Sequence, residues 1–404
     1  MSASSAIKTH LRNIPAGVWV LGFVSMLMDI SSEMIHALLP IYMVTVLGTS
    51  TLAVGLIEGI AEATAAITKV FSGVLSDRLG KRKELAALGY GMAAITKPVF
   101  PLAPSLGWLI AARFIDRVGK GVRGAPRDAL VADLAPLEVR GASFGLRQSL
   151  DTVGAFLGPL LAILLMLVTA NNFATVFWVA VIPAFLALGL IVFAVHEPAR
   201  PKGLRHVKSP LSRRELARLG GEYWWIVAVA TVFTLARFSE AFLILRAQSV
   251  GLPIALAPAV MVLMNIVYAL SAYPAGVMSD RMDRRTILVA GLVILILADI
   301  VLALSNTIGG IAVGVVLWGL HMGLTQGLLA TLVADTAPAE LRGTAYGMLN
   351  LATGIALLAA SVIAGGLWDA IGPRGTFLAG AAFSAIAIIG LIGLRQHTKG
   401  NRKA

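Results

Sequence analysis

Cysteine is absent from the 404-residue sequence, and charged residues are scarce, because Asp, Glu, Lys and Arg together make up only 13% of it. The missing thiols exclude disulfides, thiolate metal sites and cysteine nucleophiles. Soluble globular domains carry about 25% charged residues, so the low charge argues against that class. Hydrophobic residues make up 58% of the chain and its mean hydropathy is +0.85, which is typical of a membrane protein.

Long apolar runs recur along the whole chain, separated by short breaks rich in Gly, Pro, Asn or charged residues. A spanning helix needs about 20 mostly apolar residues, and a helical bundle satisfies its backbone polar groups inside lipid. The sequence therefore predicts an all-α membrane protein with twelve transmembrane helices, the first of them retained rather than cleaved. These helices are expected at residues 16–47, 52–74, 85–102, 107–132, 142–169, 173–195, 222–247, 253–278, 286–305, 308–333, 343–367 and 375–394.

The formal net charge of +12 is unevenly placed along the chain. Basic residues gather in every second segment between the predicted helices, whereas the other turns keep little beyond Arg246 and Arg374. By the positive-inside rule this pattern places both termini in the cytoplasm. It accounts for the basic character of the chain without a nucleic acid as partner.

The sequence divides into two similar halves. We expect an N-terminal six-helix bundle at 1–195, a cytoplasmic linker at 196–222, and a C-terminal six-helix bundle with a short tail at 223–404. The segment GVLSDRLGKRK, from Gly73, matches GVMSDRMDRR, from Gly276, at an offset of 203. The segment VADLAPLEVRGASFG, from Val131, matches VADTAPAELRGTAYG, from Val333, at an offset of 202. Parallel repeats of this kind are a transporter architecture.

Three motifs in the first half carry a family resemblance. GVLSDRLGKR, at 73–82, resembles the loop motif between helices two and three of the major facilitator superfamily. RVGKG, at 117–121, resembles the fourth-helix RxxxG motif of that family, with Lys where Gln is common. GAFLGP, at 154–159, resembles the fifth-helix motif of its drug and proton antiporter branch, although Leu-Leu follows where that motif has Gly-Gly. The resemblance implies secondary transport by alternating access, with export as the direction.

The motifs also imply roles for particular residues. By resemblance the loop motif is a gate that stabilises the outward-facing state, while plain topology is the alternative explanation of its basic residues. The gating residues of the two copies are Gly73, Asp77, Arg78, Gly80, Arg82, Asp280 and Arg281. Glycine and proline allow spanning helices to approach closely and bend, which is the helix-packing role expected of Gly154, Gly158 and Pro159.

Charges at membrane depth are costly and usually functional. At 100° per residue, the charges between 113 and 128 share one side of the fourth helix, and acids share one face of the first and second helices. The residues predicted to couple transport to protons are Asp29, Glu33, Glu58, Glu62, Arg113, Asp116 and Arg117. We favour Asp29 and Glu33 as the coupling carboxylates, and a static salt-bridge lattice is the alternative.

The expected function is proton-coupled efflux of a small toxic solute or drug. Because the sequence has no phosphate-binding P-loop, the proton gradient is the expected energy source and no cofactor is expected; zinc and serine-based enzyme signatures are missing as well. Substrate contacts, or packed hydrogen bonds instead, are predicted at His36, Lys120, Arg147, Arg237, Glu240, Asn265 and His321.

Two other substrates remain open. The stretches DISSEMIHALLP and RFIDRVGKGVRGAPRDAL resemble superfamily permeases associated with nickel resistance, which makes divalent metal efflux an alternative, and scattered lysines and arginines leave an organic anion possible. No resident metal site is expected, because methionines in a membrane helix are more often packing. We expect a monomer, surrounded by the lipid bilayer of a bacterial cytoplasmic (inner) membrane.

Overall fold

The computed structural model describes residues 14–103, 105–136, 139–197, 218–325, 336 and 341–401, and every regular element in these ranges is a helix. The elements are α2 (Ala16–His36), α3 (Leu39–Thr45), α4 (Thr51–Leu79), α5 (Arg82–Thr96), α6 (Val99–Leu102), α7 (Leu106–Leu134), α8 (Arg140–Val168), α9 (Phe173–Phe193), α11 (Gly221–Ala236), α12 (Ala241–Ser249), η2 (Ile254–Leu256), α13 (Ala259–Arg281), α14 (Arg284–Leu304), α15 (Ile308–Thr325), α17 (Arg342–Ile371) and α18 (Pro373–Asn401).

The predicted all-α membrane architecture is confirmed. Eleven stretches of the described helices are long and apolar enough to cross a membrane, and they correspond to eleven of the twelve predicted spans. The twelfth is α7, whose 29 residues are long enough but carry the charged stretch between 113 and 128. The chain is therefore a multi-pass membrane protein in which one spanning helix is unusually polar.

Four spans are not continuous helices, as the sequence analysis expected them to be. The first ends at His36 because Pro40 has no N–H for the carbonyl of that residue, and the third breaks after Thr96 before Pro98. The seventh is interrupted between Ala236 and Ala241 without a proline. The eighth begins with the single turn η2 before α13.

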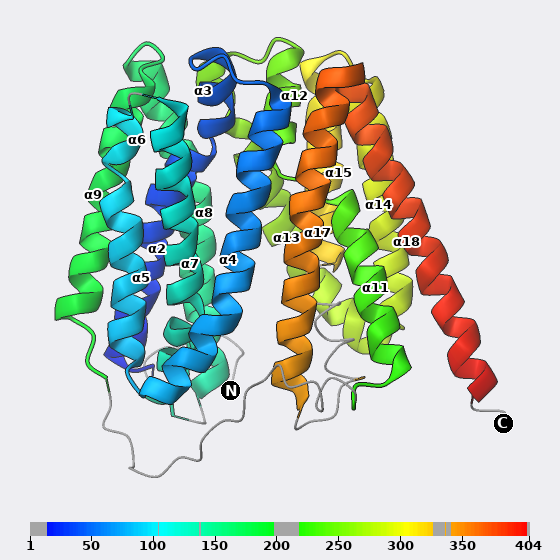
Figure 1. The fold of residues 1–404 in the computed structure, drawn as a ribbon, viewed down its shortest axis with the longest axis horizontal. Helices are drawn as coiled ribbons and strands as arrows, with labels where there is room; N and C mark the ends of the chain where they lie inside the picture. The colour runs from blue at the N-terminus through cyan, green and yellow to red at the C-terminus, as the bar shows by residue number, and fades with distance from the viewer. Residues whose placement is uncertain are drawn as a thin grey trace, which may run out of the picture. The chain divides into compact units, whose positions relative to one another are not determined.

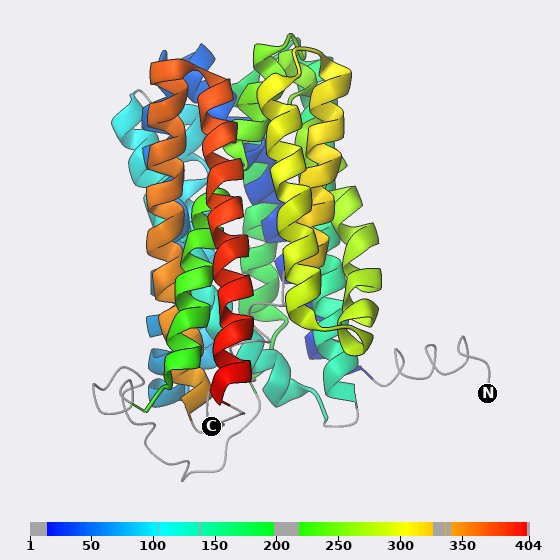
Figure 2. The same ribbon diagram turned by 90° about the vertical axis from the view of Figure 1, so that its right-hand side faces the viewer.

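Contacts divide the chain into two compact units: the first comprises Met1–Leu38 and Thr64–Lys208, and the second comprises Leu39–Ala63 and Ser209–Ala404. In the first unit α2 packs against α8 and α9, while α5 packs against α7 and α9 (Figure 1). In the second unit α11 packs against α17 and α18, while α14 packs against α15 and α18; Figure 2 shows α18, in red, beside α11 and α17. Each of these pairs in one unit has its counterpart in the other, so the sequence repeat is also a repeat of helix packing.

The segment Leu39–Ala63 groups with the second unit, whereas the sequence analysis assigned it to the N-terminal bundle at 1–195. The reason is close helix packing within the second unit. A Cβ atom at Gly59 would lie 3.1 Å from the Cα of Leu358 on α17. The carboxylate of Asp369 accepts hydrogen bonds from the backbone N–H groups of Thr51, at 3.1 Å, and Leu52, at 2.8 Å. Most of the predicted linker, at 198–217, lies outside the described residues.

Equivalent glycines fix helix contacts in both units. A Cβ atom at Gly121 on α7 would lie 2.8 Å from the backbone oxygen of Ala65 on α4. At Gly323 on α15, 202 residues later, it would lie 3.1 Å from the backbone nitrogen of Ala272 on α13. Only glycine permits backbones to approach this closely, so these positions set which faces of the helices meet.

Candidate functional site

The charged side chains of the polar helix α7 face the interior of the first unit. Arg113, Asp116 and Arg117 are buried, each with 2% exposure or less, whereas Phe114 and Ile115 are more than 40% exposed. This is the arrangement that the periodicity predicts: an apolar side faces outward and a charged stripe faces the neighbouring helices. Because such charges have lost their hydration, each needs a partner inside the protein.

Asp116 finds its main partner on α5's C-terminal end. The Nζ atom of Lys97 lies 2.9 Å from Oδ1 of Asp116, and it also donates to the hydroxyl of Ser32 on α2 at 3.1 Å. The Nε atom of Arg117 lies 3.2 Å from the second oxygen of Asp116. The sequence analysis did not assign Lys97 to this site, although a single lysine just before Pro98 at the end of an apolar helix is a signal for it.

Asp29 is paired with a residue that the sequence analysis missed. The carboxyl groups of Asp29, on α2, and Asp151, on α8, lie close enough to interact electrostatically. Two ionised carboxylates repel each other, and a proton on one of them removes this repulsion. The pair is therefore a candidate proton site in the membrane-spanning part of the first unit.

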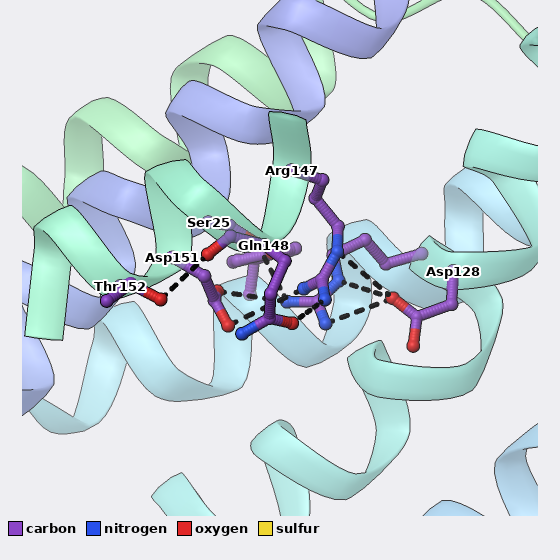
Figure 3. A network of polar contacts seen from close by, with 8 residues as sticks. Ser25, Asp128, Arg147, Gln148, Asp151 and Thr152 are labelled. Atoms are coloured by element: carbon purple, nitrogen blue, oxygen red, sulfur yellow. Dashed lines mark hydrogen bonds and ion pairs between the residues drawn. The ribbon is translucent and has the colours of Figure 1, made fainter. Parts of the chain in front are cut away.

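Arg147 on α8 lies between two carboxylates (Figure 3). Its Nη1 atom is 3.6 Å from Oδ2 of Asp151, and its Nε atom is 3.8 Å from Oδ1 of Asp128 on α7. It also donates a 2.6 Å hydrogen bond to the side-chain oxygen of Gln148. The sequence analysis placed Arg147 among substrate contacts, and the structure places it beside the carboxyl pair.

Arg127 on α7 completes this network. It donates to the hydroxyl of Ser25 on α2 at 2.7 Å and to Asp128 at 3.1 Å, and its Nη1 atom lies 3.8 Å from Oδ1 of Asp151. Two guanidinium groups thus flank the carboxyl group of Asp151.

Glu33 lies one helical turn beyond Asp29 on α2. Its carboxylate is 3.3 Å from Nδ1 of His36, and both side chains are half-buried. Lys120 on α7 is exposed and close enough to interact electrostatically with both Asp29 and Glu33. Gly154, Gly158 and Pro159 are buried in α8, and the two glycines lie directly against α2 at Asp29 and Glu33. The predicted packing motif therefore brings α8 to the acidic face of α2.

The other two predicted coupling acids belong to the second unit. Glu58 is fully buried and Glu62 is half-buried, both on the part of α4 that packs with that unit. The prediction that Glu58 and Glu62 act in proton coupling together with Arg113 stays a prediction.

Part of the predicted gate is described. Gly80 has a positive φ of 66°, as a tight turn before α5 requires. Gly73 packs near Ala125, which a Cβ atom at 73 would approach to 3.3 Å. Arg82 lies 2.7 Å from Asp133 on α7 and donates to the Ala129 carbonyl at 2.8 Å. The side chains of Asp77, Arg78, Asp280 and Arg281 lie outside the described part of the structure.

In the second unit, Arg237 and Glu240 occupy the break between α11 and α12 and interact electrostatically. The Cζ atom of Arg237 lies 5.9 Å from the ring centre of Phe233. His321 is fully buried, its Nδ1 atom 3.0 Å from the Gly291 carbonyl.

Asn265 is half-buried on α13. Among the described residues, no three His, Asp or Glu side chains gather closely enough to hold a metal ion.

Apolar spanning helices arranged as two parallel repeats are a transporter architecture. Comparison with known proteins identifies the family: the sequence model described as Major Facilitator Superfamily matches residues 21–266 and 241–404, so the chain belongs to this superfamily.

Relatives support that assignment along the whole chain. An uncharacterized MFS-type transporter of Methanocaldococcus jannaschii is 33% identical, covering 93% of this chain and 94% of its own. The inner membrane transport protein YajR of Escherichia coli is 27% identical, covering 91% of this chain and 81% of its own. The class B tetracycline resistance protein of Escherichia coli is 31% identical over 31% of each chain.

Solved structures share the fold. A mutant form of the nucleoside transporter NupG is similar with a TM-score of 0.78 at 13% identity, covering 94% of this chain and 99% of its own. A bacterial homolog of the human lysosomal transporter Spinster is similar with a TM-score of 0.76 at 17% identity, covering 95% of this chain and 97% of its own.

Proposed function

We propose that this transporter exports a small toxic solute or drug in exchange for protons. The observation that carries the proposal is the closeness of the Asp29 and Asp151 carboxyl groups, because a proton on one of them removes the repulsion between two carboxylates. Uptake and release of that proton supplies what coupling to a proton gradient needs.

The neighbours of the pair suggest how coupling works. Asp151 keeps its charge beside Arg127 and Arg147, while Asp29 takes up and releases the proton. Lys120, exposed and near both Asp29 and Glu33, offers a positive charge that can compete with the proton or meet a substrate. When a rearrangement of α2 against α8 separates the two carboxyl groups, the reason for sharing the proton is lost and it can leave.

Two further features support export from a bacterial inner membrane. The GAFLGP motif at 154–159 resembles that of drug and proton antiporters, and part of the chain is similar to a tetracycline resistance protein. The relative YajR is named as an inner membrane transport protein. The positive-inside pattern of the sequence supports a cytoplasmic location of both termini.

The test is transport by purified protein in lipid vesicles with an imposed pH gradient, using lipophilic cations, Ni²⁺ and organic anions as separate probes. We expect the lipophilic cations to move across the membrane in the direction opposite to the protons. Movement of Ni²⁺ or an organic anion instead would replace the substrate class, and movement of none of the three would contradict export.

Variants then test the coupling residues. Asp29→Asn and Asp151→Asn should each abolish the dependence of transport on the pH gradient, and Glu33→Gln should reduce it. Glu84→Gln is the matched control, because Glu84 pairs with exposed Lys81 at 2.9 Å on the protein surface. Unchanged coupling in both Asp29→Asn and Glu33→Gln would contradict the assignment.

A further inference from the structure

A single acidic residue, Asp299, lies inside the apolar helix α14. It interrupts the run ILVAGLVILILADIVLAL, at 287–304, and none of the motifs in the sequence includes it. The side chain is fully buried, and neither of its oxygen atoms has a hydrogen-bond partner among the described residues. Leaving an ionised carboxylate without water or partner is among the most costly arrangements in a protein.

Asp299 lies close to α18 and in the neighbourhood of an aromatic cluster. A Cβ atom at Gly380 on α18 would lie 2.7 Å from Oδ2 of Asp299 and 3.2 Å from a ring carbon of Phe238. Phe238 packs in turn against Trp318 and Phe377, with ring centres 5.5 and 5.4 Å away. Gly380 thus leaves room for the carboxyl group between α14 and α18.

Charged and titratable groups on the neighbouring elements make no hydrogen bond or ion pair to Asp299. Those described on the helices packed against α14, and in the break beside Phe238, are Tyr268, His321, Arg374, Arg237 and Glu240. The nearest placed along α14 is Arg246 of α12, whose Nε atom donates to the carbonyl of Leu302, three residues after Asp299 and about 4.5 Å away along the helix. Its other nitrogens donate to Ser249, Ser305 and Asn306, and not to Asp299.

The repeat gives Asp299 a counterpart. At the offset of 202 residues, Asp299 corresponds to Lys97 of the first unit, and Trp318 corresponds to Asp116. In the first unit these two positions are joined at 2.9 Å. In the second unit Asp299 and Trp318 are both buried. Within the described ranges, neither the carboxyl oxygens of Asp299 nor the indole N–H of Trp318 has a hydrogen-bond partner. Equivalent positions of the two repeats therefore hold an ion pair in the first unit and two groups without hydrogen-bond partners in the second.

We propose that Asp299 is a proton-binding site of the second unit, and that the indole N–H of Trp318 is the donor that receives its carboxylate when the proton leaves. A metal or sodium ion would need several oxygen ligands, whereas within the described ranges no three His, Asp or Glu side chains gather to hold an ion and neither oxygen of Asp299 has a hydrogen-bond partner. A proton needs only the carboxyl group itself. A neutral acid also fits a helix whose other residues between 287 and 304 are apolar.

Proton loss would have a structural consequence. An ionised Asp299 would draw the Trp318 N–H toward it, adding a polar contact between the packed helices α14 and α15 like the one that Lys97 makes between α5 and α7. A role of this site in transport rests on the proton coupling proposed above. The binding of a proton by Asp299 does not depend on that proposal.

The experiment is infrared spectroscopy of the full-length protein in lipid at neutral pH, observing the C=O stretching band of protonated carboxyl groups. We expect Asp299→Asn to remove a component of this band. Asp369→Asn is the matched control in the same unit, because three hydrogen bonds from Thr51 and Leu52 hold that carboxylate ionised, and it should leave the band unchanged.

Two more variants keep the test decisive. Asp299→Glu should retain the component at a shifted frequency, and this comparison serves if the Asn variant does not fold. Trp318→Phe should retain it unshifted, because the indole is not bonded to the carboxyl group in this conformation. A band that is the same in wild type, Asp299→Asn and Asp299→Glu would overturn the proposal whether or not the protein transports anything.

Discussion

Gly158 of α8 faces Glu33 of α2 so closely that a Cβ atom at 158 would lie 2.7 Å from the Cβ atom of Glu33. One turn earlier, a Cβ atom at Gly154 would lie 3.0 Å from the Cβ atom of Asp29. The two glycines that resemble an antiporter motif thus have a direct physical task. They let α8 lie flat against the acidic face of α2, which is what brings Asp151 to Asp29.

Replacement of Gly158 by alanine should therefore disturb both packing and coupling. The added methyl group has no room, and overpacking of this kind costs about 1 to 3 kcal/mol. We expect Gly158→Ala to lower the thermal unfolding temperature in detergent and to weaken proton coupling in vesicles. Gly145→Ala is the control in the same helix, because a Cβ atom there meets nothing within 4 Å; it should be neutral or stabilising. Equal behaviour of the two variants would show that the close contact is unimportant.

The Lys97–Asp116 ion pair should be strongly coupled. Removing one partner leaves the other charge buried, which typically costs about 3 to 5 kcal/mol. We expect Lys97→Met and Asp116→Asn each to be strongly destabilising, and the double variant to lose clearly less than the sum of the two. Unfolding of the four proteins in detergent gives the interaction energy directly.

The exposed Lys81–Glu84 pair is the control for this cycle, since surface ion pairs contribute little. Strictly additive losses for Lys97→Met and Asp116→Asn would mean that the two buried groups do not depend on one another.

Asp369 should act as a helix cap from a distant part of the chain. Its carboxylate binds the first backbone N–H groups of α4 and the hydroxyl of Thr51, over a sequence separation of 318 residues. Loss of a cap costs about 0.5 to 2 kcal/mol. We expect Asp369→Ala to be more destabilising than Asp369→Asn, which retains one acceptor oxygen. Hydrogen exchange of the amides of Thr51 and Leu52 provides the local measurement, and unchanged exchange in the Ala variant would contradict the capping role.

Arg82 and Asp133 should control the rate of transport. Their 2.7 Å ion pair joins the start of α5 to the last turn of α7, beside the loop motif. If this pair is part of the gate, Arg82→Gln and Asp133→Asn should change the maximal transport rate in vesicles more than the substrate concentration at half-maximal rate. The charge-exchanged double variant should recover part of the loss.

Lys83→Gln is the control for the gate variants, because Lys83 belongs to the same basic turn but donates to the Val192 carbonyl. A loss as large as that of Arg82→Gln would indicate that general positive charge, and not the pair, is what matters.

Several features follow from residue order alone. Apolar runs of spanning length, basic segments on one side, and two pairs of segments at offsets of 202 and 203 predict twelve helices in two repeats. The charged side of α7 also follows, because helical periodicity is a local property. Breaks at prolines could have been anticipated, since Pro40 and Pro98 lie within the first and third spans, while the break between Ala236 and Ala241 has no such signal.

Contacts between helices are a different matter, because they depend on which faces meet. The structure brings Asp151 to Asp29 and Lys97 to Asp116, and the sequence analysis predicted neither Asp151 nor Lys97 as a partner. Gly154 and Gly158 allow α8 to approach α2 closely, and this approach brings Asp151 to Asp29.

The sequence by itself thus determined the class of protein: a membrane transporter of two helical repeats, with acids and bases placed at membrane depth. Only the tertiary structure decided which charges are paired, that the carboxyl groups of Asp29 and Asp151 lie near each other, and that Asp299 has no hydrogen-bond partner among the described residues. The reason is physical. Hydropathy and periodicity fix what each helix is and which side is polar, whereas the pairing of buried charges depends on close approaches between residues far apart in the chain.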